Sequence, residues 1–173
     1  MVRKEIIACV KSSGIGVLPT DTIYGVVGSA LKPMAVERLY TVRGRQPKKP
    51  FIVLIASVAD LALFGVHPAT RTRALLSKLW PGPVSVILSC PGKKFAYLHR
   101  GTGTIAFRVP GSPKLRAFLK KTGPLAAPSA NIAGKPPATT AREAYTYFKG
   151  TVDFYIDGGE HAGAPSSLIE VKR

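Results

Sequence analysis

The first run with chemical potential is residues 19–25, PTDTIYG, in which two threonine hydroxyls flank an aspartate. It follows the apolar residues 15–19, which we expect to form a buried strand. Open α/β sheets bind ligands beyond the carboxyl ends of their strands, which is where Thr20, Asp21 and Thr22 would lie. The same residue types also form turns, because their side chains bond to nearby backbone and Gly25 permits a bend. Both a ligand site and a plain turn fit this run.

Two arginines separated by a glycine form a second candidate, Arg43-Gly44-Arg45, at the predicted end of a helix. Gly44 lets the backbone turn, so that both guanidinium groups could converge on one phosphate through paired hydrogen bonds. Cations are also favoured at helix C-termini, because they interact well with the helix dipole. The run is therefore either an anion site or an ordinary helix end.

A hydroxyl and an amide form the third candidate, Ser129 and Asn131 in the run PSAN at residues 128–131. The run follows a short apolar stretch that we expect to be a strand. Side chains two residues apart in extended backbone point to the same side, so both groups would face one ligand. A turn stabilised by the same two side chains is the alternative.

Several common catalytic and nucleotide-binding patterns are absent from the sequence. It has no GxxxxGK[ST] phosphate loop and no GxSxG serine-hydrolase elbow. The three histidines lack metal-ligand spacing, and the two cysteines make neither a disulfide framework nor a zinc site. With 9 acidic residues in the chain, paired-carboxylate hydrolysis and two-metal sites are disfavoured. We therefore expect no protein-held metal, and a nucleotide would be held by cations and loop donors.

The charge of the chain is strongly positive and unevenly placed. Lysine and arginine total 25 against 9 acidic residues, a formal net charge of +16 at pH 7. Residues 61–142 contain no aspartate or glutamate, whereas cations recur there: Arg71, Arg73, Lys78, Lys93, Lys94, Arg100, Arg108, Lys114, Arg116, Lys120, Lys121, Lys135 and Arg142. Such a surface attracts a nucleotide, RNA or another phosphate-rich partner. A solvated face without a specific partner explains the same charges, and both interpretations stay open.

Positioning these candidate groups requires a sheet flanked by helices. The 173 residues suit a single domain. Predicted helices and strands are interspersed, which indicates an α/β fold, and some connections are too short for parallel crossovers, so the sheet should be mixed. Helices are predicted at 1–12, 33–42, 58–64 and 69–79, from a cap at Ser112 to 120, and from a cap at Thr139 or Thr140 to 148. Strands are predicted at 15–19, 51–55, 84–89, 104–109, 124–127, 152–156 and 168–171.

The apolar runs of the sequence are short. The run at 51–55 is far below the ~20 residues that cross a bilayer. The N-terminal residues lead into only a brief apolar stretch, which does not match a secretory signal. We therefore expect a cytoplasmic protein that does not associate with a membrane.

The three runs described above and the run WPGP at 80–83, in this order and spacing, resemble the YrdC-like family of L-threonylcarbamoyl-AMP synthases. The resemblance extends from residue 14 to residue 171 and includes the runs RVP at 108–110 and APSS at 164–167. It implies one YrdC-like domain over residues 1–173, a twisted mixed sheet flanked by helices, with a positively charged concave cleft. It also implies an enzyme that makes threonylcarbamoyl-AMP and pyrophosphate from L-threonine, bicarbonate or CO2, and ATP.

The cofactors and partners that the family implies are few. ATP is a substrate, and Mg2+ is expected to ride on its phosphates, because the chain has few carboxylates to hold it. A separate tRNA threonylcarbamoyl transferase passes the product's threonylcarbamoyl group to an adenosine next to the anticodon. RNA binding on the basic face of this chain is a further expectation.

The resemblance also implies roles for individual residues. The family's K-x-R and S-x-N runs supply its catalytic set, which falls here on Arg43, Arg45, Ser129 and Asn131. The implied threonine-binding residues are Thr20, Arg108, Ser129 and Ser166. The implied ATP-binding residues are Arg43, Arg45, Thr104, Asn131 and Thr139.

Two departures from the family pattern affect ATP binding. Arg43 stands where the family has a lysine, which keeps the charge but changes reach and geometry. Family members generally continue past the strand at 167–171 into another strand, whose arginine helps to hold ATP, whereas this sequence ends at Arg173. Either other cations hold ATP in its place, or the protein continues beyond this residue.

Three other functions fit the same residues. The first is a non-catalytic YrdC-like protein that binds double-stranded RNA or tRNA with steep salt dependence. The second is a paralogue without synthase activity, which Arg43 favours and the retained Ser129 and Asn131 oppose. The third is a carbamoyl-AMP-forming domain of a larger hydrogenase-maturation or antibiotic carbamoyltransferase enzyme, which the chain length opposes.

Overall fold

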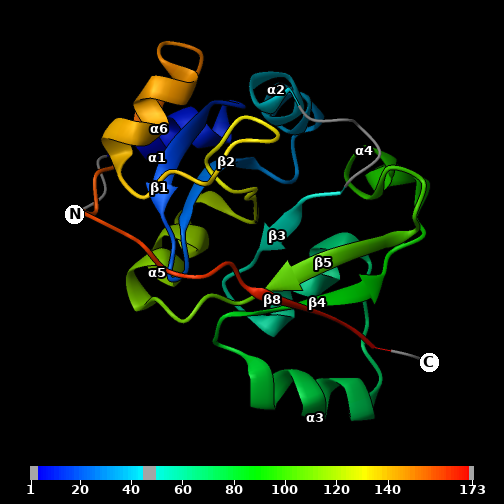
Figure 1. Cartoon of the computed structure of the whole chain (residues 1–173). Helices are drawn as coiled ribbons and strands as arrows, with labels where there is room; N and C mark the ends of the chain where they lie inside the picture. Colours follow the sequence, from blue (N-terminus) through cyan, green and yellow to red (C-terminus); the bar gives the residue numbers. More distant parts are fainter. Residues whose placement is uncertain (1–3, 45–49, 172–173) are drawn as a thin grey trace.

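One eight-stranded sheet organises this computed structural model, which describes residues 4–44 and 50–171. The strand order is β7-β1-β2-β6-β3-β5-β4-β8 (Figure 1). The strands are β1 (Ile15–Pro19), β2 (Tyr24–Ser29), β3 (Ile52–Leu54), β4 (Val84–Ser89), β5 (Thr104–Arg108), β6 (Leu125–Ala126), β7 (Phe154–Tyr155) and β8 (Ser167–Glu170). The helices are α1 (Lys4–Lys11), α2 (Pro33–Arg43), η1 (Val58–Phe64), α3 (Thr70–Leu79), η2 (Lys93–Phe95), α4 (Ala96–His99), α5 (Pro113–Thr122) and α6 (Ala141–Phe148).

The strand pairing is mixed, as the sequence predicts. β1 pairs antiparallel with β2, and β2 pairs antiparallel with β6. β3 runs parallel to β5, whereas β4 is antiparallel to β5 and parallel to β8. In Figure 1, β1 and β2 run in a clearly different direction from β4 and β5. The sheet is therefore strongly twisted, as right-handed strand twist requires.

Apolar side chains alternate between two cores, one on each face of the sheet. On β1, Ile15 and Val17 pack into the larger core, whereas Leu18 packs into the smaller one. Val10 of α1 and Phe118 of α5 also belong to the smaller core, and the larger core takes side chains from α2, α3 and α6. Because both faces are covered, the central strands are buried along almost their whole length.

Strand β2 is an element that the sequence does not predict, and the expectation of a bend at Gly25 is wrong. The sequence of β2, YGVVGS, contains two glycines, which lower the preference for a strand. Gly28 is needed for packing, because a Cβ at this position would lie 2.8 Å from Cγ2 of Ile15 and 3.2 Å from Cβ of Ala35. Glycine therefore lets β1 and α2 approach β2 closely.

Helix ends follow the predicted capping residues. Gly44 ends α2 in the left-handed conformation, with φ of 57°. Ser112 caps α5 by accepting a hydrogen bond from the N–H of Leu115 at 3.2 Å. Of the two candidate caps of α6, the structure uses Thr140. Among the described residues, no helix combines the length and the apolar character needed to span a membrane.

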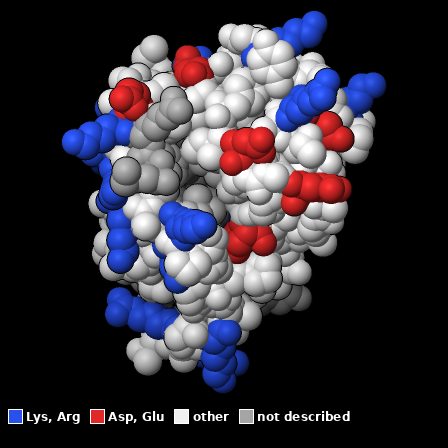
Figure 2. All heavy atoms as spheres, turned by 90° about the vertical axis from the view of Figure 1, so that its left-hand side faces the viewer, with Lys and Arg blue, Asp and Glu red and all other residues white. Residues whose placement is uncertain are grey.

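The face of the molecule in Figure 2 carries charges of both signs. Lysine and arginine side chains lie mainly towards its edges, whereas aspartate and glutamate side chains lie nearer its middle. The net charge of +16 therefore does not make this whole face positive.

Candidate active site

A cavity of about 270 Å3 lies where the turn between β1 and β2 meets the end of β5 and the start of β8. All four predicted threonine-binding residues line it: Thr20, Arg108, Ser129 and Ser166. Among the described residues that line the cavity, Arg108 is the only one with a charged side chain. The cavity is thus lined, among the described residues, mostly by neutral side chains around one buried cation, and the expected positively charged cleft stays a prediction.

Thr20 closes the turn at one edge of the cavity. Its Oγ1 donates to the carbonyl of Ile23 at 2.7 Å and accepts from the N–H groups of Thr22 and Ile23 at 3.1 and 3.2 Å. The run therefore forms a turn, as one interpretation of residues 19–25 predicts, and the turn lines the cavity, whereas ligand binding there stays a prediction. The hydroxyl of Thr20 is already engaged by its own turn.

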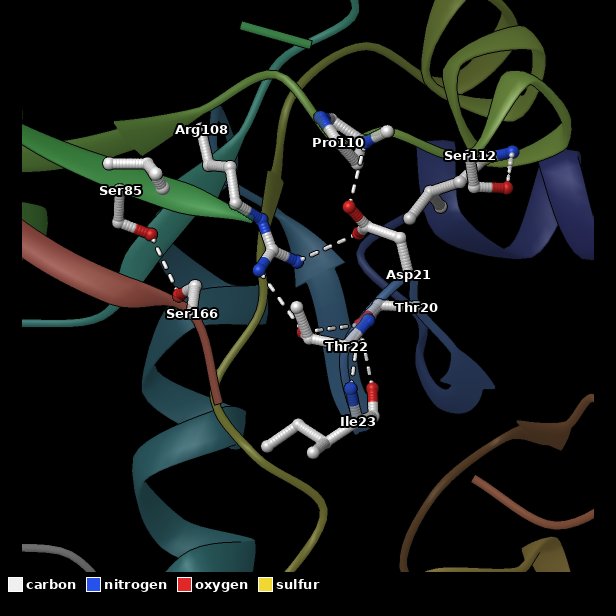
Figure 3. A network of polar contacts seen from close by, with 12 residues as sticks. Thr20, Asp21, Thr22, Ile23, Ser85, Arg108, Pro110, Ser112 and Ser166 are labelled. Carbon is white, nitrogen blue, oxygen red and sulfur yellow. Dashed lines mark hydrogen bonds and ion pairs between the residues drawn. The ribbon is translucent and has the colours of Figure 1, made fainter. Parts of the chain in front are cut away.

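Arg108, the last residue of β5, reaches this turn, as Figure 3 shows. Its Nη1 donates to Oγ1 of Thr22 at 3.1 Å and its Nη2 to Oδ1 of Asp21 at 3.2 Å. Arg108 is only 4% exposed. Burial lowers the pKa of its guanidinium, and the charge of Asp21 raises it. Arginine remains charged in proteins, so this is a buried cation that suits a carboxylate ligand.

Arg43, Ser129 and Asn131 form one hydrogen-bonded cluster. Nη2 of Arg43 donates to Oγ of Ser129 at 3.1 Å and to Oδ1 of Asn131 at 3.0 Å, and its Nε donates to the carbonyl of Asn131 at 3.0 Å. Ser129 also donates to Oδ1 of Asn131 at 2.6 Å. The structure therefore brings together three of the four predicted catalytic residues. The fourth, Arg45, lies outside the described residues.

The loop that carries Ser129 is fixed by β2. The N–H of Val26 donates to the carbonyl of Pro128 at 3.0 Å, and the N–H of Ala130 donates to the carbonyl of Tyr24 at 2.9 Å. Ser129 itself forms an isolated bridge with a residue of β2. The strand that the sequence does not predict is therefore the element that places Ser129 against the cavity.

Arg43 and Asn131 are not among the residues that line the cavity, and they are 3% and 7% exposed. Only Ser129 of the cluster borders the cavity. The amide nitrogen of Asn131 donates to the carbonyls of Ile132 and Lys135, at 3.0 and 2.7 Å, so this side chain also shapes the loop that follows it. The cluster thus stands directly behind one wall of the cavity.

Two predicted ATP-binding residues lie away from the cavity lining. Thr104 is the first residue of β5, at the opposite end of the strand from Arg108. Thr139 donates through its N–H and Oγ1 to Oε2 of Glu143, at 2.7 and 3.0 Å. Those hydrogen bonds lower the pKa of Glu143. The structure does not join either threonine to the Arg43 cluster, and their contact with ATP stays a prediction.

Tyr24 lines the cavity and Ser85 contacts the lining residue Ser166, although the sequence does not predict either as a site residue. The hydroxyl of Tyr24 donates to the carbonyl of Gly159 at 2.8 Å, and Oγ of Ser85 lies 2.9 Å from Oγ of Ser166 (Figure 3 draws the serine pair). These two contacts fix the segment 157–166 at Gly159 and at Ser166, near the turn between β1 and β2. Burial raises the pKa of Tyr24, so its phenol stays protonated and can donate. Tyr24 belongs to the candidate run at 19–25. Ser85 lies within an apolar strand, where nothing in the local sequence indicates a role in the site.

The twisted mixed sheet flanked by helices, with a small cavity at its strand ends, places the chain in the α/β class of proteins. A family model described as "Telomere recombination", with the name Sua5_yciO_yrdC, matches residues 8–173. The chain belongs to this Sua5/YciO/YrdC family, which confirms the resemblance seen in the sequence motifs.

Three similar curated relatives are named threonylcarbamoyl-AMP synthase. A threonylcarbamoyl-AMP synthase of Pyrococcus abyssi is 34% identical over 155 residues, which cover 88% of this chain and 46% of the relative. The enzyme of the same name in Bacillus subtilis is also 34% identical, covering 88% of this chain and 44% of the relative. That of Nitrosococcus oceani is 30% identical and covers 92% and 87%. The chain thus spans less than half the length of the first two relatives.

Solved structures show the same fold. The structure of Pyrococcus abyssi Sua5 complexed with L-threonine superposes with a TM-score of 0.89 at 30% identity, covering 96% of this chain and 50% of that one. Escherichia coli YciO superposes with a TM-score of 0.85 at 23% identity, covering 98% and 83%. The α/β fold with a mixed sheet is therefore confirmed.

Proposed function

We propose that this chain is an L-threonylcarbamoyl-AMP synthase, which makes threonylcarbamoyl-AMP and pyrophosphate from L-threonine, bicarbonate or CO2, and ATP. The observation that carries the proposal is the convergence of Thr20, Arg108, Ser129 and Ser166 on one cavity. Its volume of about 270 Å3 lies just below the usual range of drug-sized ligand pockets. That volume suits an amino acid rather than a whole nucleotide. The name shared by the relatives points to the same reaction.

Threonine recognition in this proposal rests on Arg108. A carboxylate in the cavity would pair with its buried guanidinium through charge-assisted hydrogen bonds, which are stronger where water is excluded. Ser129 and Ser166 would offer hydroxyls to the rest of the amino acid. The apolar residues of the lining, such as Ile52 and Leu54, would surround its methyl group.

The chemistry proceeds in two steps that need positioning more than a general base. The amine of threonine attacks CO2 and loses a proton, giving a carbamate. A carbamate oxygen then attacks the α-phosphorus of ATP, and pyrophosphate leaves, so the reaction is a nucleotidyl transfer. Two anions must meet, and preorganised donors can contribute about 3–4 kcal/mol each to such a transition state. We assign this role to the Arg43, Ser129 and Asn131 cluster, together with Arg45.

The nucleotide would lie next to the cavity rather than in it, with Thr104 and Thr139 as further contacts to be tested. Within the described residues, no group of three histidine, cysteine, aspartate or glutamate side chains is arranged to hold a metal ion. We therefore propose that Mg2+ arrives on the phosphates of ATP as part of the substrate. A tRNA threonylcarbamoyl transferase protein would receive the product, and we propose that the chain acts in the cytoplasm.

RNA binding is the alternative function, and the exposed cations of α5 favour it. Lys114, Lys120 and Lys121 are exposed on this helix, and such a surface attracts a polyanion. A protein that only binds RNA would lose affinity steeply as salt rises, because phosphate contacts release counterions. It would release no pyrophosphate from ATP.

The test is pyrophosphate release measured with the complete mixture and with threonine, bicarbonate or ATP omitted in turn. We expect release only when all three substrates are present. Arg45→Ala should abolish that release while the circular dichroism spectrum stays unchanged. Release that does not depend on threonine, or no release together with salt-sensitive RNA binding, would contradict the proposed function.

A further inference from the structure

Arg108 is held by a carboxylate that is not itself part of the cavity lining. Oδ1 of Asp21 accepts from Nη2 of Arg108 at 3.2 Å, and the two side chains are 12% and 5% exposed. Oδ2 of the same aspartate accepts from the backbone N–H of Gly111 at 2.7 Å. Asp21 therefore ties the turn between β1 and β2 to the end of β5 and the loop that follows it (Figure 3).

The guanidinium of Arg108 is held at two of its three nitrogens. Nη2 bonds to Asp21 and Nη1 to Oγ1 of Thr22, whose hydroxyl lies 3.0 Å from that of Thr20. The remaining nitrogen, Nε, is buried and has no hydrogen-bond partner among the described residues. Asp21 and Thr22 are therefore the described residues that fix the orientation of the guanidinium.

An arginine side chain has several rotatable bonds, and orienting it for a ligand costs conformational entropy. A carboxylate that fixes the plane of the guanidinium before the ligand arrives removes that cost from binding. Asp21 is suited to this task, because its second oxygen is anchored on the backbone of Gly111. The carboxylate of Asp21 accepts from two donors, Nη2 of Arg108 and the N–H of Gly111. Asparagine at position 21 would turn its own N–H group towards one of these donors, and that hydrogen bond would be lost.

We propose that Asp21 is a positioning residue, which fixes the guanidinium of Arg108 so that it receives the carboxylate of the amino-acid substrate. This inference rests on the proposed function, because it assumes that threonine binds in the cavity. Asp21 acts through Arg108 and touches no reacting atom. Its removal should therefore weaken threonine binding and leave ATP binding and the chemical step largely intact.

The test is Asp21→Asn, assayed by pyrophosphate release with threonine and ATP varied separately. We expect the KM for threonine to rise at least tenfold, while the KM for ATP and the kcat change less than threefold. A merely structural role would lower the active fraction, so the apparent kcat would fall and both KM values would stay unchanged. An unchanged KM for threonine would overturn the proposal.

Asp153→Asn is the matched control. Asp153 also accepts from an arginine and from a backbone N–H, those of Arg38 and Ile15, both at 2.8 Å, but it does not line or contact the cavity. This variant should leave both KM values unchanged. An equal rise in the KM for threonine in this control would also overturn the proposal, because the effect would then be general.

A second variant covers the case in which Asp21→Asn does not fold. Asp21→Glu keeps the charge beside Arg108 and displaces it by one methylene, so we expect a smaller rise, about threefold to tenfold, in the KM for threonine. An unchanged value would contradict the proposal. The wild-type assay separates a failure of the proposed function from a failure of this inference. A wild-type protein that releases no pyrophosphate contradicts the proposed function. An active wild-type protein together with an Asp21 variant of unchanged KM for threonine contradicts only this inference.

Discussion

At the scale of single residues, the site depends on how two arginines are held. Arg108 is buried beside Asp21 and Thr22, and Arg43 is buried beside Ser129 and Asn131. In both cases the guanidinium donates to side-chain oxygen atoms of a loop, and Arg43 also donates to a backbone carbonyl. Burial without these partners would leave an unpaired charge in a medium of low dielectric, which is strongly destabilising. The hydroxyl and amide groups that accept from the two arginines are therefore as necessary for a stable site as the arginines themselves.

Arg43→Lys tests whether charge alone is required at the position where the family resemblance expects a lysine. Arg43 donates from Nε to the carbonyl of Asn131 and from Nη2 to two side chains. One ammonium group cannot reproduce this fork, so a buried carbonyl loses its donor. We expect the variant to lose roughly 1–3 kcal/mol of unfolding free energy.

The turnover of Arg43→Lys should fall by about tenfold, which corresponds to a change of about 1.4 kcal/mol in the activation free energy. The measurements are urea denaturation and pyrophosphate release. Arg142→Lys, an exposed arginine on α6, is the matched control and should change neither quantity. Wild-type stability and turnover in the Arg43 variant would show that only its charge matters.

At the scale of elements, β2 joins the fold to the site. It pairs with β1 and β6, and it also binds the loop that carries Ser129. Its glycine at position 28 allows β1 and α2 to pack at short range. The geometry of the cavity therefore depends on close packing several residues away from it.

Gly28→Ala tests this packing. The added methyl group would lie 2.8 Å from the Cγ2 methyl group of Ile15, a β-branched side chain with little freedom to move. Overpacking of this kind costs about 1–3 kcal/mol. We expect a lower urea midpoint with an unchanged slope.

Gly92→Ala is the control for that substitution, because Gly92 has φ of −62° and an added methyl group would meet no described atom within 4 Å. It should leave the stability unchanged or raise it by a few tenths of a kcal/mol. Equal urea midpoints for the two variants would show that β2 tolerates a side chain at position 28.

Most elements follow from the sequence, because they have strong local signals. The strand at 84–89 and the caps at Ser112 and Gly44 match the structure. β2 does not follow from it, because its glycines serve long-range packing, which local propensity does not record. The site also has parts that follow from local sequence and parts that do not. The two-residue spacing of Ser129 and Asn131 predicts that their side chains point to the same side. In contrast, Ser85 meets Ser166 only because β4 pairs with β8.

At the scale of the whole molecule, the sheet order brings distant segments to one cavity. The cavity is lined by residues of the β1–β2 turn, by Arg108, by residues 127–129 and by Ser166, although these segments lie far apart in the sequence. The net charge of +16 describes the surface, whereas the cavity contains a single described cation. Charge composition therefore predicts an anionic partner, and the topology decides where a small anion can be enclosed.

The most direct measurement is a crystal structure of the protein with L-threonine bound. The expected result is one threonine molecule in the cavity between the β1–β2 turn and β8, with its carboxylate within hydrogen-bond distance of the Arg108 guanidinium. The hydroxyl of Ser129 should lie on the side of the bound threonine that is nearer to Arg43 and Asn131. Threonine bound elsewhere, or bound in the cavity with its carboxylate turned away from Arg108, would contradict the account.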